Sequence, residues 1–134
     1  MGPIIIMSLP GKQPRILIVD EEYCVASTLS VVLCSLGFEA TFFTESVEAL
    51  QAAQCDAPDL LLSEVSMSVL SGIELAIQVR ELCPECKVLF LSGKPDIVDL
   101  LETSRANGHP FDVLPKPIHP TVLLSEIQAT LGIA

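Results

Sequence analysis

Polar residues that could do chemistry stand directly after short apolar runs, where strands would end. They are Asp20, Glu21 and Glu22 after the first run, Glu64 after the third, Ser92 after the fourth and Lys116 after the fifth. Carboxylates held close together repel one another unless a cation neutralises them. Their hard oxygens suit Mg²⁺, which accepts only a few protein ligands. Lys116 can pair with a carboxylate or a phosphoryl oxygen, and Ser92 can donate a hydrogen bond to the same group.

Five short apolar runs predict the strands that position these residues. The first, Arg15–Val19, is continuous and aliphatic, as is typical of a strand buried on both faces of a parallel sheet. We expect the other strands over residues 39–43, 60–63, 87–91 and 111–114.

Segments with helical spacing of apolar residues separate these runs. The first ends at Gly37, a suitable C-cap, and the second can be capped by Thr44 or Ser46 and ends before Pro58. Three more are expected over residues 72–82, 95–106 and 120–131, the last with Pro120 in its first turn. The expected inward positions are Val25, Leu29, Val32, Leu33 and Leu36 in the first helix and Val47, Leu50 and Ala53 in the second.

Alternation of this kind predicts an α/β fold: a five-stranded parallel sheet with helices on both faces and right-handed crossovers, a doubly wound flavodoxin-like (βα)5 arrangement. In such open sheets, sites form beyond the carboxyl ends of the strands. The polar residues named above therefore converge on one edge.

The length of 134 residues suits one compact domain. We expect a flexible leader over residues 1–13 and a folded domain over residues 14–134, with no second domain attached. The apolar run at residues 4–7 is far too short to span a bilayer, which takes about 20 residues.

The chain is strongly acidic, with 17 Asp and Glu against 7 Lys and Arg and a formal net charge of −10. Such a field repels phosphate backbones and anionic lipids, which argues against binding to nucleic acid or to membranes.

Five cysteines, an odd number, are scattered among apolar residues, and no secretory signal precedes them. They predict reduced, mostly buried thiols of a cytoplasmic protein. Cys83 and Cys86 have the C-x-x-C spacing of zinc and redox sites, but His109 and His119 have no metal-like spacing.

Four segments together resemble the response-regulator receiver domains of two-component phosphorelay signalling, over essentially all of residues 14–132. They are the acidic motif at 16–22, the phosphoacceptor segment at 58–68 with Gly72 following, the strand at 88–93 that ends in a switch Ser, and the Lys-Pro element at 114–117.

The resemblance implies roles for individual residues. Asp20, Glu21, Glu64 and the main-chain carbonyl of Ser66 would hold Mg²⁺. Ser92 would sense the state of the acidic site and Lys116 would bridge to it, while Pro117 is a candidate for a cis peptide bond. Partners would be a histidine kinase or another signalling protein, bound through the fourth helix, fifth strand and fifth helix.

The chain departs from the family pattern at four positions. Glu64 stands at the phosphoacceptor position in place of Asp, which moves the carboxylate about 1.5 Å farther from the backbone. Glu21 replaces the commoner second Asp, Ser68 stands where Pro is usual, and Val113 replaces the aromatic that moves with the switch hydroxyl.

Our leading hypothesis is a signalling interaction module, not an enzyme: a pseudo-receiver in which phosphorylation is lost or altered. The alternative is a conventional phosphoacceptor that still takes phosphate from a histidine kinase, with Ser63 or Ser66 as weaker acceptors. A third reading is an unrelated small α/β enzyme or redox protein that uses Cys83 and Cys86.

Overall fold

A computed structural model describes residues 13–93 and 98–133. Ten elements alternate along the chain as β1 (Arg15–Val19), α1 (Tyr23–Ser35), β2 (Glu39–Phe43), α2 (Ser46–Cys55), β3 (Leu60–Glu64), α3 (Gly72–Leu82), β4 (Lys87–Ser92), α4 (Val98–Ala106), β5 (Val113–Pro115) and α5 (Pro120–Leu131). The expected leader lies outside the described residues apart from Gln13, and so do residues 95–97 of the expected fourth helix.

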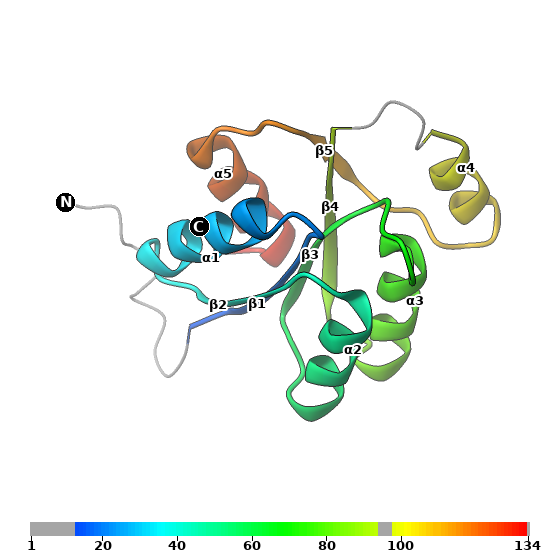
Figure 1. The fold of residues 1–134 in the computed structure, drawn as a ribbon, viewed down its shortest axis with the longest axis horizontal. Coiled ribbons are helices and arrows are strands. Elements are labelled where there is room, and N and C mark those ends of the chain that lie inside the picture. Colours follow the sequence, from blue (N-terminus) through cyan, green and yellow to red (C-terminus); the bar gives the residue numbers. More distant parts are fainter. Residues whose placement is uncertain (1–12, 94–97, 134) are drawn as a thin grey trace.

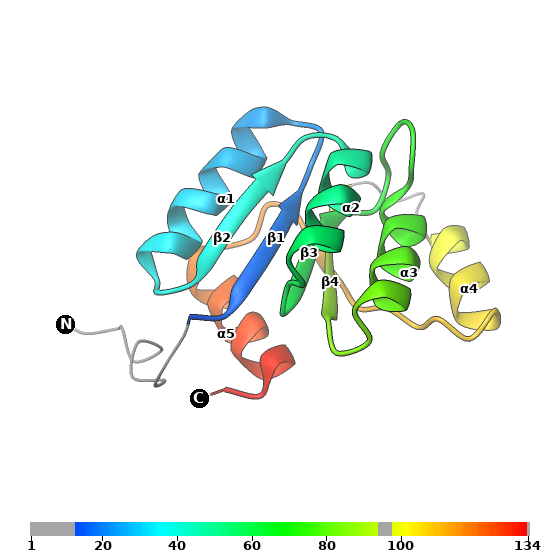
Figure 2. The same ribbon diagram turned by 90° about the horizontal axis from the view of Figure 1, so that it is seen from below.

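The strands form one parallel sheet in the order β2-β1-β3-β4-β5. Helices α1 and α5 cover one face, and α2, α3 and α4 cover the other (Figures 1 and 2). The predicted fold class is therefore confirmed. The order reverses between β1 and β3, and sites in open sheets form at this kind of switch point.

Alternating residues of the central strands fill two cores, one on each side of the sheet. In β1, Ile16 and Ile18 pack toward α1 and α5, whereas Leu17 and Val19 pack toward α2 and α3. All four side chains are buried, which explains why β1 reads as a continuous apolar run.

One inward position of the helices was predicted wrongly. Val47, in the first turn of α2, is 44% exposed, and the buried residues of this helix are Ser46, Ala49 and Ala53. The N-cap of α2 is Glu45, without a side-chain cap, so neither Thr44 nor Ser46 caps it. In α1, Leu33 is buried as predicted, and Ala26 is the second buried residue.

The fifth strand begins at Val113, two residues later than predicted. Phe111 is buried without joining the ladder, because it packs edge-on against Phe90 with ring centroids 5.2 Å apart. The guanidinium of Arg80 in α3 lies over the Phe111 ring, 4.9 Å from its centroid. Phe111 is therefore part of the hydrophobic core through its ring, although it lies outside the strand.

The prediction that most thiols are buried was wrong. Cys24 and Cys34 lie on the outer surface of α1, Cys55 ends α2, and all three are exposed. These cysteines have apolar neighbours in the sequence, but they lie on the side of each helix that faces solvent. Only Cys83 and Cys86 are buried.

Candidate functional site

Three charged side chains meet beyond the carboxyl ends of β1, β3 and β5. Asp20 follows β1, Glu64 is the last residue of β3, and Lys116 follows β5. The Lys116 ammonium donates to Asp20 Oδ2 at 2.5 Å and to Glu64 Oε1 at 2.8 Å. Both carboxylates are buried, with side chains 5% and 7% exposed, so these are ion pairs largely withdrawn from water. We call Asp20, Glu64 and Lys116 the charged triad.

Main-chain donors engage the other carboxylate oxygens of the triad. Asp20 Oδ1 accepts from the Glu22 amide at 2.9 Å. Glu64 Oε2 accepts from the amides of Val65 at 2.8 Å and Ser66 at 3.3 Å. Each of the four oxygens therefore has a donor from the protein, and hydrogen bonds to ionised groups are the stronger ones.

Glu21, predicted as a metal ligand beside Asp20 and Glu64, makes a hydrogen bond outside the charged triad. Its Oε2 accepts from the Ser68 amide at 2.7 Å, in the loop between β3 and α3. This bond ties the segment after β1 to the segment after β3 across the edge of the sheet. Among residues 13–93 and 98–133, no three carboxylate, thiol or imidazole side chains gather in a way that could hold a metal ion.

The neighbouring backbone fixes the position of Lys116. The Lys116–Pro117 peptide bond is cis, and the Lys116 amide donates to the Ser92 carbonyl at 3.0 Å. Ser92 is the buried last residue of β4, so it lies beside the main chain of the lysine. Val113 is half-buried two strand positions before Pro115.

The charged state of the triad follows from competing effects on pKa. Burial by itself raises the pKa of Glu64, but the hydrogen bond and charge of Lys116 and the amides of Ser66 and Val65 outweigh it, so the pKa is lowered. Burial likewise lowers the pKa of Lys116, and the hydrogen bonds and charges of Asp20 and Glu64 reverse this and raise it. Both groups are ionised at neutral pH.

A close approach at Gly72 holds the loop after β3 in place. A Cβ atom at this position would lie 2.0 Å from the Glu64 carbonyl oxygen, and the Gly72 amide donates to the Val65 carbonyl at 2.8 Å. Only glycine fits, because the obstacle is backbone and not the flexible end of a side chain.

A capping box at the start of α3 anchors the same loop. Ser71 accepts from the Glu74 amide, and Glu74 accepts from the Ser71 amide. Sequence reasoning missed this pair, although Ser-x-x-Glu before an apolar helix is its usual signature. It missed the amides of Val65, Ser66 and Ser68 as well, because main-chain donors leave no mark in the sequence.

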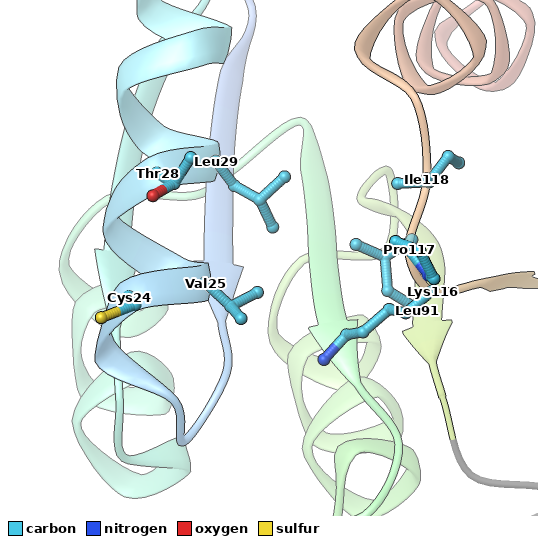
Figure 3. Close-up of a pocket in the computed structure, with 8 residues that line it drawn as sticks. All are labelled: Cys24, Val25, Thr28, Leu29, Leu91, Lys116, Pro117 and Ile118. Carbon is cyan, nitrogen blue, oxygen red and sulfur yellow. The ribbon is translucent and has the colours of Figure 1, made fainter.

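An aliphatic pocket of about 510 Å³ adjoins the triad on the α1 side of the sheet. Figure 3 shows Val25 and Leu29 of α1 directed toward Leu91 and the Lys116–Pro117 segment. Lys116 therefore contributes to the wall of this pocket while its ammonium binds the carboxylates.

Of the two buried cysteines, Cys86 is protonated at neutral pH. Burial, with a smaller contribution from Cys83, raises the pKa of Cys86 to about 12. The thiolate is the form that attacks disulfides, so without a bound metal Cys86 is a poor nucleophile. Within the described residues, no helix has the length and apolar character needed to cross a bilayer.

Comparisons with known proteins agree with this architecture. The model of the response regulator receiver domain matches residues 16–128. The response regulator MprA of Mycobacterium leprae is 32% identical over 117 residues, which cover 87% of this chain and 50% of that protein. The chain thus spans about half the length of the curated relatives it matches.

Solved structures resemble the chain over nearly its whole length. The chemotaxis protein CheY4 of Vibrio cholerae is 26% identical with a TM-score of 0.78, covering 89% of this chain and 99% of that one. The signal receiver domain of an HD domain-containing protein from Pseudomonas fluorescens is 25% identical with a TM-score of 0.81, covering 90% and 96%. This chain belongs to the response regulator receiver domain family of two-component signalling proteins.

Proposed function

We propose that this receiver domain signals through protein–protein contact and does not carry a phosphoryl group on Glu64. It is an atypical receiver in which the acceptor position is filled by a carboxylate already engaged with the protein. The observation that supports this most strongly is the bond of 2.8 Å between Glu64 Oε1 and Lys116, together with the two amides on Oε2.

The length of the Glu64 side chain weakens it as an acceptor. Phosphoryl transfer requires donor, acceptor and metal to be aligned to within fractions of an ångström. Glutamate carries its carboxylate about 1.5 Å farther from the backbone than aspartate, so an in-line donor placed for aspartate is misplaced here. The same extra length lets the carboxylate contact Lys116 and partly imitate a phosphorylated aspartate, with one charge instead of about two.

The proposed contact surface is the face formed by α4, β5 and α5, and the proposed partner is a histidine kinase or another signalling protein. Val122 on α5 is 50% exposed, and Glu102 and Thr103 on α4 are exposed as well. A surface with both apolar and polar exposed residues is usual for a transient interface. Asp96, which belongs to the fourth helix expected from the sequence, lies outside the described residues.

The test is treatment with acetyl phosphate and Mg²⁺, followed by intact and fragment mass spectrometry, on the parent and on Glu64→Asp in parallel. The parent is expected to show no adduct at Glu64. Glu64→Asp is expected to acquire one, because it restores the acceptor length. An adduct mapped to Glu64 in the parent would overturn the proposal.

A further inference from the structure

We propose that Lys116 and main-chain amides balance the charges of Asp20 and Glu64 in place of a divalent cation, and that this site does not bind Mg²⁺. This inference rests on the assignment of the charged triad to the receiver site. It goes further than the proposed function, because a receiver can lose phosphorylation and still bind metal.

The carboxylates of the site do not fit Mg²⁺ as they are arranged. The ion needs oxygen ligands that converge with near-octahedral geometry, and it gives up bound water reluctantly. Both oxygens of Asp20 and both of Glu64 accept hydrogen bonds from the protein instead. A metal would have to displace the Lys116 ammonium from two buried carboxylates before it could bind them.

The bond between Glu21 and Ser68 removes a further ligand from the site. Glu21 Oε2 accepts from the Ser68 amide at 2.7 Å, so one oxygen of this carboxylate is bound to the loop between β3 and α3. The bond depends on a residue with an N–H at position 68, and proline has none. The residue type at position 68 therefore decides whether Glu21 is held in the loop.

The length of Glu64 completes the arrangement. Its Oε1 contacts Lys116 while its Oε2 accepts from the amides of Val65 and Ser66, so one side chain bridges the lysine and its own loop. Aspartate is about 1.5 Å shorter and cannot keep both sets of bonds from the same backbone position. Glu21, Glu64 and Ser68 thus act together to close the site to a cation.

The test uses Mn²⁺ and Mg²⁺ without any phosphodonor. Paramagnetic Mn²⁺ broadens the amide signals of residues most strongly when they are close to it, so broadening that is strongest at Val65 and Ser66 reports binding at this site. Calorimetric titration with Mg²⁺ at constant ionic strength gives the affinity. We compare the parent with the double variant Glu64→Asp/Ser68→Pro and with Ser68→Ala, a matched control that keeps the N–H at position 68.

The parent and Ser68→Ala are expected to show no selective broadening and no saturable heat at millimolar metal. The double variant is expected to show selective broadening and saturable heat at millimolar metal, a gain in affinity of about 10-fold or more over the parent, which is the scale on which the surroundings of metal ligands act. If the parent shows selective broadening and saturable heat at millimolar metal, the inference is wrong. If the double variant folds and gains no affinity, these residues are not what closes the site.

Lys116→Met gives a second variant that leaves the loop unchanged. It is expected to gain metal affinity, because a cation then has two carboxylates without a positive partner. If both variants remain folded, as judged by circular dichroism, and neither gains metal affinity, the inference is wrong. Metal binding by the parent without an adduct at Glu64 contradicts this inference alone, whereas an adduct contradicts the proposed function.

Discussion

Lys116 holds the site together at the scale of single residues, because it is the cation shared by two buried carboxylates. Removing one partner of such an arrangement is costly, since the remaining charges stay buried without compensation. The stability of the domain should therefore depend on this lysine far more than on a lysine at the surface.

Lys116→Met is expected to lower the free energy of unfolding by about 3 kcal/mol at neutral pH, the lower end for a buried pair because the lysine is 18% exposed. Urea unfolding followed by circular dichroism measures this change. The control is Lys87→Met at an exposed position of β4, expected to change stability by less than about 0.5 kcal/mol. Equal losses in the two variants would show that the triad contributes nothing specific.

Gly72→Ala is expected to destabilise the domain by about 2 to 3 kcal/mol, because the new methyl group meets the Glu64 carbonyl at 2.0 Å. Gly93→Ala is the control, since the nearest atom to its added methyl group is the Lys116 Cβ at an ordinary 3.6 Å. Thermal unfolding of both variants measures the difference. A Gly72→Ala protein as stable as Gly93→Ala would refute the close approach.

At the scale of elements, the loop from β3 to α3 links Glu64 to the fold. The Gly72 amide binds the Val65 carbonyl, and the Ser71–Glu74 capping box fixes the start of α3 just beyond it. Loss of the cap should loosen the loop as well as the helix.

Ser71→Ala is expected to cost about 1 kcal/mol, the usual value for loss of an N-cap. Ser125→Ala at an exposed position of α5 serves as the control and should be nearly neutral. Chemical denaturation gives both values, and amide hydrogen exchange at Val65 and Ser66 shows whether the loop opens. If amide hydrogen exchange at Val65 and Ser66 is unchanged in Ser71→Ala, the cap does not stabilise the loop.

The sequence predicts the elements well where buried apolar runs determine them. The first two strands and the third and fifth helices have the predicted bounds, because each is delimited by capping or turn residues. The errors lie where a side chain has two possible environments. Val47 turns to solvent, Phe111 is buried outside a strand, and Cys24 faces outward from a helix.

The site is predictable from the sequence only in part. The carboxyl ends of parallel strands bring Asp20, Glu64 and Lys116 together, and this follows from the order of elements. Which oxygen meets which donor does not follow, because the amides of Val65 and Ser68 depend on the conformation of a loop. These individual contacts decide whether a cation or Lys116 balances the charges of Asp20 and Glu64.

At the scale of the whole molecule, the charged triad makes the free energy of unfolding depend on pH. The pKa of Glu64 is lowered from 4.5, so its contribution is fully present above pH 4.5 and is lost as pH falls through the folded value. The pKa of Lys116 is raised from 10.5, so its contribution is present below pH 10.5 and is lost as pH rises through the folded value.

Glu64→Gln is expected to flatten the acid side of this profile, because glutamine does not titrate. Denaturant unfolding at intervals between neutral pH and pH 3 gives both curves, and the difference between parent and variant should shrink below pH 4.5. Exposed Glu126→Gln on α5 is the control and should follow the parent. Parallel curves for parent and Glu64→Gln would exclude a lowered pKa at Glu64.

The most direct test of the central claim is the response of the parent to beryllofluoride with Mg²⁺, a tetrahedral analogue of a carboxylate-bound phosphoryl group. The amide NMR signals of Val65, Ser66 and Ser92 report on the site and on the end of β4. The account predicts that these signals stay in place, because Glu64 is already bound to Lys116 and no metal joins it. Saturable shifts of these signals in the parent would contradict it.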